Sequence, residues 1–169
     1  MAAKSSAAAK SAESAPQELT ITRILDAPRD LVFRVWTRPE HLVRWWGPTG
    51  FTLPQCKMDL RPGGAFHYIM RSGEEGCEIS GEKPGTDHRL RGVFREIKPP
   101  ERLVFTWAWE DENGKLGHET LVTVTMTEQG SKTKLTLHQA VFESVTARDA
   151  HNTGWTSSIE RLAAYVESL

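Results

Sequence analysis

The hydrophobic positions of this chain change their period along its length, and each period predicts an element. The clearest case is residues 102–110, where apolar and ring-bearing side chains alternate. One face of this expected strand carries Leu103, Phe105, Trp107 and Trp109, and the other carries Val104, Thr106, Ala108 and Glu110. A Pro99-Pro100 corner joins it to a preceding strand that begins near Arg91. A face with so many rings has to be covered by another element or has to bind something.

Two short helices are expected near the start of the regular pattern. A first strand, 19–25, is followed by Asp26-Ala27-Pro28, which is typical of a helix start. Arg38-Pro39 ends this first helix and begins a second one, 40–46, which Gly47-Pro48 terminates. Trp45 and Trp46 are consecutive, about 100° apart on a helix, so we expect only one of them to point fully inward.

Strands dominate the middle of the chain. Residues 51–60 read as extended up to the turn Arg61-Pro62-Gly63-Gly64, and the next strand places Phe66, Tyr68 and Met70 on one face with His67 on the other, solvated face. Residues 72–86 contain four glycines and predict a long loop.

The last expected hairpin, 118–128 with 131–142, turns at Gln129-Gly130 and can be given a register. It pairs Val122 with Leu137, Val124 with Leu135, and Met126 with Thr133 on an inner, apolar face. Continuing the parity outward puts three polar side chains on the same inner face: His118, Thr120 and Gln139. Either they lie at the open, wet end of the sheet, or they are polar anchors in a ligand cavity.

A long helix, 146–168, is expected at the end of the chain. Its buried stripe is formed by His151, Gly154, Trp155, Ser158, Leu162, Tyr165 and Val166. Gly154 costs about 1 kcal/mol relative to Ala inside a helix. We therefore expect another element, the sheet beneath Trp155, to approach the helix closely there.

The order of elements predicts an α+β helix-grip fold: a curved antiparallel sheet of about seven strands around a long C-terminal helix, with two short helices after the first strand. We expect one domain over 18–169 and a disordered Ala/Ser/Lys-rich tail over 1–17. A curved sheet and a single helix seldom fill the space between them, so an apolar cavity is the expected by-product.

Composition excludes several classes. The net charge is −1 with interleaved signs, which argues against a nucleic-acid partner, and no apolar run is long enough for membrane insertion. Cys56 and Cys77 lie in dissimilar contexts, which favours two reduced thiols in a cytoplasmic protein. A monomer or weak dimer is expected. No His, Cys or carboxylate spacing indicates a metal, and no motif indicates another cofactor.

Several motifs together resemble one family. Ala27-Pro28, Trp45-Trp46-Gly47-Pro48, Pro62-Gly63-Gly64, Phe105-Thr106-Trp107 and Gly154-Trp155 occur in this order. Together they resemble the family of activator-of-heat-shock-protein-90-ATPase homologues, within the START/birch-pollen-allergen (SRPBCC) superfamily. The stretch 72–87 departs from that resemblance, because it is longer than the usual hairpin of the family. The resemblance implies the helix-grip fold and a hydrophobic cavity, and it does not by itself imply a reaction.

Three functions follow as alternatives. The first is binding of a lipid-like, aromatic or polyketide-like compound in a cavity between sheet and helix. The second, from the family name, is a co-chaperone acting on the heat-shock protein 90 ATPase. The third is an enzyme of cyclase or dehydratase type, with His118, Tyr68 and His151 as candidate acid/base groups and His151 facing His118 across the cavity. The expected cavity residues are Trp36, Phe66, Tyr68, Met70, Phe105, Trp107, Trp109, His118, Thr120, Val122, Trp155, Ser158 and Leu162.

Overall fold

The computed structural model describes residues 17–74 and 83–169. The expected tail therefore lies outside the described residues except for Gln17, as does most of the glycine-rich stretch after residue 74. The elements are β1 (Glu18–Leu25), α2 (Arg29–Thr37), α3 (Pro39–Trp45), β2 (Phe51–Met58), β3 (Ala65–Ser72), β4 (Asp87–Lys98), β5 (Arg102–Glu110), β6 (Thr120–Gln129), β7 (Lys132–Ala140) and α5 (Val145–Glu167).

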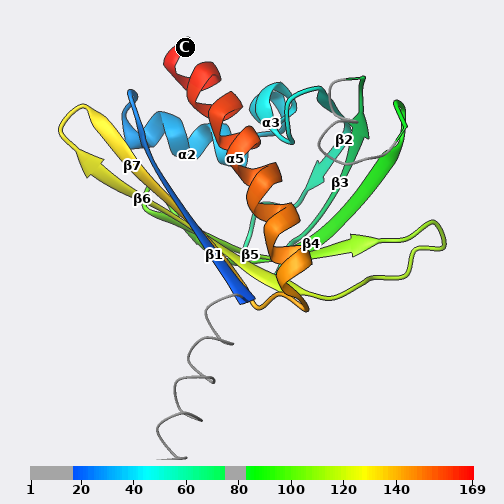
Figure 1. Cartoon of the computed structure of the whole chain (residues 1–169). Helices are drawn as coiled ribbons and strands as arrows, with labels where there is room; N and C mark the ends of the chain where they lie inside the picture. Colours follow the sequence, from blue (N-terminus) through cyan, green and yellow to red (C-terminus); the bar gives the residue numbers. More distant parts are fainter. Residues whose placement is uncertain (1–16, 75–82) are drawn as a thin grey trace, which may run out of the picture.

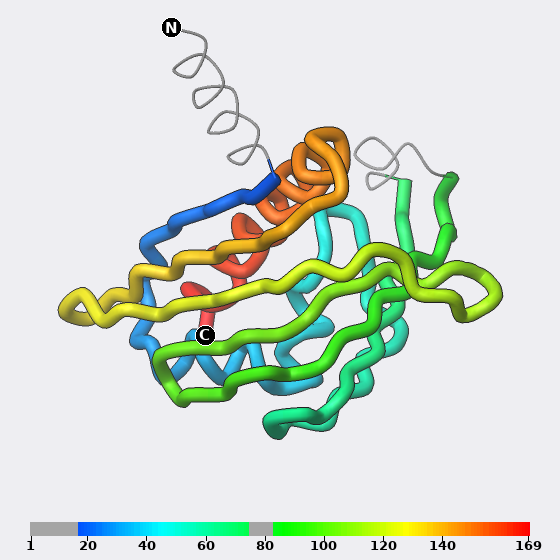
Figure 2. Tube along the Cα trace, turned by 90° about the horizontal axis from the view of Figure 1, so that it is seen from below, coloured from blue at the N-terminus to red at the C-terminus, as the bar shows by residue number. Residues whose placement is uncertain are grey.

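The strands form a single antiparallel sheet in the order β1-β7-β6-β5-β4-β3-β2. From β2 to β7 each strand pairs with its neighbour in sequence, while β1 returns to pair with β7 at the far edge. The sheet is strongly curved, and α5 runs across its concave face, with α2 and α3 beside it (Figure 1). Seen from below, the strands lie in front of all three helices (Figure 2). This confirms the expected helix-grip fold.

The concave face and the helices enclose the hydrophobic core. Along β5, Leu103, Phe105 and Trp107 belong to this core, whereas the alternate residues Val104, Thr106 and Ala108 are buried outside it, as the alternation predicts. Phe66, Tyr68 and Met70 of β3 are buried beside them. Helix α5 begins where the Ser144 side chain caps it by accepting a hydrogen bond from the Ala147 backbone N–H at 3.1 Å. Its buried face matches the expected stripe, with Trp155, Leu162 and Val166 directed inward.

The register of the β6–β7 hairpin differs from the predicted one by two residues. Val124 pairs with Leu137, and Met126 pairs with Leu135. The turn lies one position later than expected, because Gln129 still pairs with Lys132 and Gly130 adopts a φ of +61° at the first loop position. Glycine is favoured at that position in tight hairpin turns. A shift of two residues preserves strand parity, so the inner and outer faces are those expected.

Both tryptophans at the end of α3 are buried, contrary to the expectation that one would be turned away. Trp45 is the last helical residue, and its indole N–H donates to the Val35 carbonyl at 3.0 Å. Trp46 is the C-cap, with an extended backbone (φ −62°, ψ 134°). The helical 100° relation therefore does not apply to this pair, and the change of backbone lets both rings enter the core.

Candidate ligand-binding pocket

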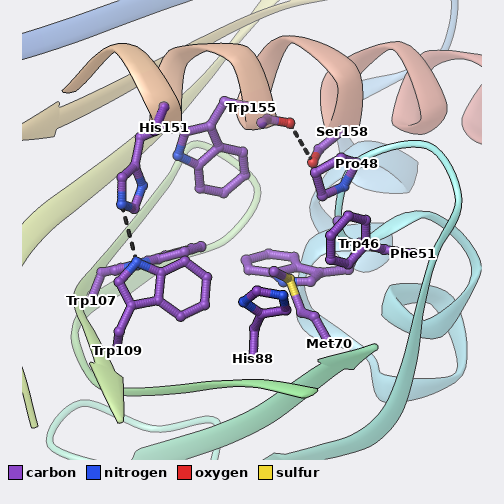
Figure 3. A pocket seen from close by; sticks show the side chains of 13 residues that line it. Trp46, Pro48, Phe51, Met70, His88, Trp107, Trp109, His151, Trp155 and Ser158 are labelled. Carbon is purple, nitrogen blue, oxygen red and sulfur yellow. Dashed lines mark hydrogen bonds between the residues drawn. The ribbon is translucent and has the colours of Figure 1, made fainter. Parts of the chain in front are cut away.

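A pocket of about 270 Å³ lies between α5, the segment that joins α3 to β2, and the inner faces of β3, β4 and β5. Its walls are mostly apolar and aromatic (Figure 3). The lining residues are Trp46, Gly47, Pro48, Phe51, Met70, His88, Trp107, Trp109, Ala150, His151, Gly154, Trp155 and Ser158. In Figure 3, His151, Trp155 and Ser158 descend from the helix, while His88 and Met70 rise from the sheet below.

Four of the lining residues are tryptophans whose rings contact one another. Trp46 stacks on Trp107 at a centroid distance of 5.9 Å and meets Trp155 edge-on at 5.5 Å. Trp107 meets Trp109 edge-on at 5.3 Å. Such offset and edge-to-face pairs contribute about 0.5–1.5 kcal/mol each beyond the area that they bury. The rings thus support one another around the pocket, which remains open between them.

A buried polar network fixes the orientation of Trp155. Its indole N–H donates to the side-chain oxygen of Gln139 at 2.8 Å, and the Gln139 amide donates to the Thr120 hydroxyl at 2.8 Å. Gln139 has no exposed surface and Thr120 retains 6%. The sequence placed both side chains on the inner face, which is confirmed. They lie neither at a wet end of the sheet nor on the pocket wall, but behind Trp155.

The segment between α3 and β2 is held against α5 by Arg161. Its guanidinium donates to four backbone oxygens, those of Trp46, Gly47, Pro48 and Phe51, at 2.9–3.4 Å. One turn earlier on the helix, the Ser157 hydroxyl oxygen accepts from the Thr49 backbone N–H at 2.8 Å. Burial lowers the pKa of Arg161 from its ordinary value. These contacts position one wall of the pocket, including Trp46 and Phe51.

His151 is the titratable group that the pocket perturbs most. Burial lowers its pKa from 6.5 to about 4, and the Glu143 carboxylate opposes this shift only in part. The ring is therefore neutral near pH 7. The Trp109 indole N–H donates to His151 Nε2 at 3.2 Å (Figure 3). Because Nε2 accepts, the proton of the neutral ring is on Nδ1.

Two residues that line the pocket each contain a buried side-chain nitrogen without a hydrogen-bond partner among the described residues. The nitrogens are Nε2 of His88 and Nε1 of Trp107. A buried polar atom without a partner destabilises the fold by roughly 1–3 kcal/mol. The two atoms belong to neighbouring strands, β4 and β5, so both come from the sheet side of the pocket.

Apart from His118, the expected cavity residues divide into three groups. Met70, Trp107, Trp109, Trp155 and Ser158 line the pocket, as does His151. Four others surround a separate void of only about 10 Å³, too small for an organic ligand: Trp36, Phe66, Tyr68 and Phe105. Three more are buried in the fold without lining either space: Thr120, Val122 and Leu162. The aromatic face of β5 is therefore divided between core and pocket wall.

The placement of His118 on the inner face is wrong. Its side chain is 43% exposed, and Nε2 lies 2.6 Å from the Val141 carbonyl oxygen. The strand β6 begins only at Thr120, so strand parity does not extend back to residue 118. The three candidate acid/base groups are not brought together, since His118 is on the surface, Tyr68 adjoins the small void and His151 faces Trp109. Burial raises the pKa of the Tyr68 hydroxyl well above its ordinary value.

The explanation given for Gly154 is also wrong. A Cβ added to Gly154 would meet only the Pro48 ring, at an ordinary contact distance of 3.7 Å. The sheet does not approach the helix closely there. Gly154 instead leaves room inside the pocket, opposite Pro48.

His67 is less solvated than expected. It does lie on the opposite face of β3 from Tyr68, but only 24% of its side chain is exposed. Its Nδ1 is 3.0 Å from Gln55 Nε2, and its Nε2 is 3.8 Å from a carboxylate oxygen of Glu110, which also pairs with Arg91. Burial and Arg91 together lower the pKa of His67.

Seven residues that line the pocket were not among the expected cavity residues: Trp46, Gly47, Pro48, Phe51, His88, Ala150 and Gly154. His88 had a detectable signal: the inward parity of Phe94, continued backward through Gly92 and Leu90, reaches residue 88.

In the part of the chain that the structure describes, no group of His, Cys, Asp or Glu could hold a metal ion. No helix of that same part is long and apolar enough to cross a membrane.

Comparison with known proteins decides the family. The model of the family described as "Activator of Hsp90 ATPase homolog 1-like protein" matches residues 26–167. The chain belongs to this family. The match spans both short helices, the whole pocket wall and α5, so the motifs that carried the resemblance lie within it. No curated protein matches the chain.

Solved structures of bacterial proteins share the fold. An AHSA1 protein from Silicibacter pomeroyi is 27% identical, with a TM-score of 0.77, over 89% of this chain and 97% of its own. A Chromobacterium violaceum protein is also 27% identical, with a TM-score of 0.74, over 90% of this chain and 98% of its own. An Arthrobacter aurescens protein is 25% identical, with a TM-score of 0.76, over 92% and 89% of the two chains. This member of the AHSA1-like family thus has the family's helix-grip fold.

Proposed function

We propose that this protein binds a hydrophobic, aromatic small molecule in the pocket beneath α5. The observation that carries the proposal is a wall of four tryptophans that contact one another and still leave about 270 Å³ between them. An apolar cavity of about 150 Å³ is enough to bind benzene. A compound of one to three fused or linked rings is therefore the size of ligand that fits.

The pocket also has the polarity that such a ligand requires. Ligand sites are mostly apolar, with a small number of polar groups that orient the bound molecule. The polar side chains here are His88, His151 and Ser158, together with the indole N–H groups. Much of the wall is already positioned by Gln139 and Arg161, so binding requires little ordering of side chains.

A pair of variants on α5 tests the proposal. Gly154→Leu places a branched side chain in the pocket opposite Pro48, whereas Thr156→Leu adds the same side chain at an exposed position of the same helix. The protein and both variants are titrated with a panel of aromatic compounds, and tryptophan fluorescence and melting temperature are followed. Saturable binding that Gly154→Leu abolishes and Thr156→Leu retains is expected. If no compound binds the unaltered protein, the proposal is wrong.

The family description supplies a second candidate, an action on the Hsp90 ATPase. Its support is family membership alone, whereas the pocket supports binding directly. The test is the ATPase rate of purified Hsp90 with and without this protein. Stimulation that survives Gly154→Leu would separate this activity from ligand binding.

A further inference from the structure

The pocket combines unused hydrogen-bond donors with an uncharged wall, and this combination restricts the ligand. We infer that the pocket selects an uncharged aromatic compound that carries a hydrogen-bond acceptor, such as a ketone or aldehyde oxygen, over carboxylates and ammonium ions of the same shape. This inference rests on the proposed binding function and names the ligand class of that same site.

One lining residue holds a donor that has no partner among the described residues. An indole nitrogen can only donate, and the Trp107 Nε1–H is buried without a partner among the described residues, in a side chain that is 6% exposed. Three other donors of the wall have acceptors within the protein: Trp109 donates to His151, Trp155 donates to Gln139, and the Ser158 hydroxyl donates to the Gly154 carbonyl at 2.8 Å. The polar atom that suits Trp107 is therefore an acceptor on the ligand.

His88 strengthens the same argument. Its Nε2 is also buried without a partner among the residues described, and its ring lies 5.7 Å from Phe51 and 6.2 Å from Trp109. In the tautomer with the proton on Nε2, this atom is a second donor from the sheet side.

The absence of charged side chains from the described pocket wall also restricts the ligand. Among the described residues, none of those lining the pocket is Asp, Glu, Lys or Arg, and the nearby Arg161 Nη1 is turned to backbone carbonyls. A carboxylate or ammonium that enters an apolar site without a counter-charge loses its hydration without compensation. An uncharged ligand has no such hydration free energy of a charged group to lose.

A cage of aromatic rings could instead bind a cation through the ring faces. Here the ring faces already have partners. Edge-on contacts place the positive edge of one ring against the negative face of another. Trp46 and Trp155, Trp107 and Trp109, and Trp107 and His151 all meet in this way. The geometry thus favours an uncharged acceptor over a cation.

A series of four naphthalenes with matched shape tests the inference by calorimetric titration of the full chain. It comprises 2-acetylnaphthalene, 2-ethylnaphthalene, 2-naphthoate and a 2-naphthyl trimethylammonium salt. The acetyl compound should bind at least about fivefold more tightly than the ethyl compound, because it accepts a hydrogen bond. It should bind at least about tenfold more tightly than either ion. Equal affinities, or tightest binding of an ion, would overturn the inference but leave the binding function intact. If none of the four binds, the proposed function itself fails.

Variants then locate the donor. Trp107→Phe and His88→Phe keep an aromatic ring and remove the nitrogen, and each should reduce the preference for acetyl over ethyl. Trp36→Phe is the matched control, because Trp36 Nε1 is also buried without a partner among the described residues but adjoins the small void instead. This control should leave the preference unchanged. A preference that persists in both pocket variants would contradict the assignment of these two donors.

Discussion

Trp155 of α5 donates its indole N–H to the side chain of Gln139 on β7 at 2.8 Å, across the boundary between helix and sheet. Gln139 in turn donates to Thr120 on the neighbouring strand. All three side chains are buried. One wall of the pocket is therefore held by a short chain of hydrogen bonds that solvent does not reach, and such buried networks favour a single conformation when every member is satisfied.

Replacing Gln139 by Leu should destabilise the protein and loosen the pocket. The substitution leaves Trp155 Nε1 and the Thr120 hydroxyl without their partner, which costs roughly 1–3 kcal/mol for each buried group left unpaired. Urea denaturation measures the loss, and fluorescence anisotropy reports the mobility of Trp155. Thr136→Val, on the outer face of the same strand, is the control and should change stability by less than about 0.5 kcal/mol. Equal stability of the two variants would show that the network contributes nothing.

His151 should make stability depend on pH in the acidic range. Its folded-state pKa of about 4 lies below the unfolded value of 6.5, so folding must keep the ring neutral. Above pH 6.5 the ring is neutral in both states and does not reduce the free energy of unfolding. As the pH falls toward 4, the unfolded chain binds a proton at His151 and the folded protein does not, so the free energy of unfolding decreases, by roughly 2 kcal/mol at pH 5. His151→Gln should remove this component. Urea midpoints of both proteins at pH 7.5 and pH 5 measure the difference, and parallel pH profiles would contradict the assigned pKa.

Arg161 should control the order of the pocket wall formed by residues 46–51. Arg161→Met removes the donor to four backbone carbonyls, and the segment should then exchange its amide hydrogens faster. Hydrogen exchange with mass spectrometry measures this directly. Arg44→Met, an exposed position on α3, serves as the control. Unchanged exchange in residues 46–51 of Arg161→Met would mean that the segment is held by packing alone.

Two glycines should respond to alanine in opposite directions. At Gly154 a methyl group fits beside Pro48, so Gly154→Ala should stabilise the protein by up to about 1 kcal/mol through helix propensity. At Gly92 the added Cβ would collide with the Thr106 carbonyl oxygen and the Phe66 ring, so Gly92→Ala should destabilise it. Thermal denaturation of the two variants provides the comparison. Stabilisation by Gly92→Ala would contradict the close approach at Gly92, and destabilisation by Gly154→Ala would contradict the free space beside Pro48.

Much of the fold could be predicted from the sequence because strand and helix periods determine which side chains face inward. The alternation along β5 placed Phe105 and Trp107 correctly, and parity placed Gln139 and Thr120 on the inner face despite the error in hairpin register. Parity failed only where it was carried beyond the strand, as at His118. It would have identified His88 if the strand had been extended backward from Phe94.

The division between core and pocket could not be predicted in the same way. Trp36 and Phe105 have the same inward orientation as Trp107, yet only Trp107 borders the larger space. That difference depends on where α5 crosses the sheet and on the hydrogen bonds by which Arg161 holds the segment 46–51 against the helix. These are contacts between residues more than 100 positions apart, and no local pattern reports them.

The six tryptophans themselves provide the most direct test of the pocket's role. Their indole N–H groups give separate signals in a ¹⁵N-labelled sample, and 2-acetylnaphthalene is added stepwise while the spectrum is recorded. Trp46, Trp107, Trp109 and Trp155 line the pocket, so their signals should shift saturably. The signals of Trp36 and Trp45, which do not line it, should stay nearly unchanged. Uniform small shifts of all six signals, or no shifts at saturating ligand, would contradict binding in the pocket beneath α5.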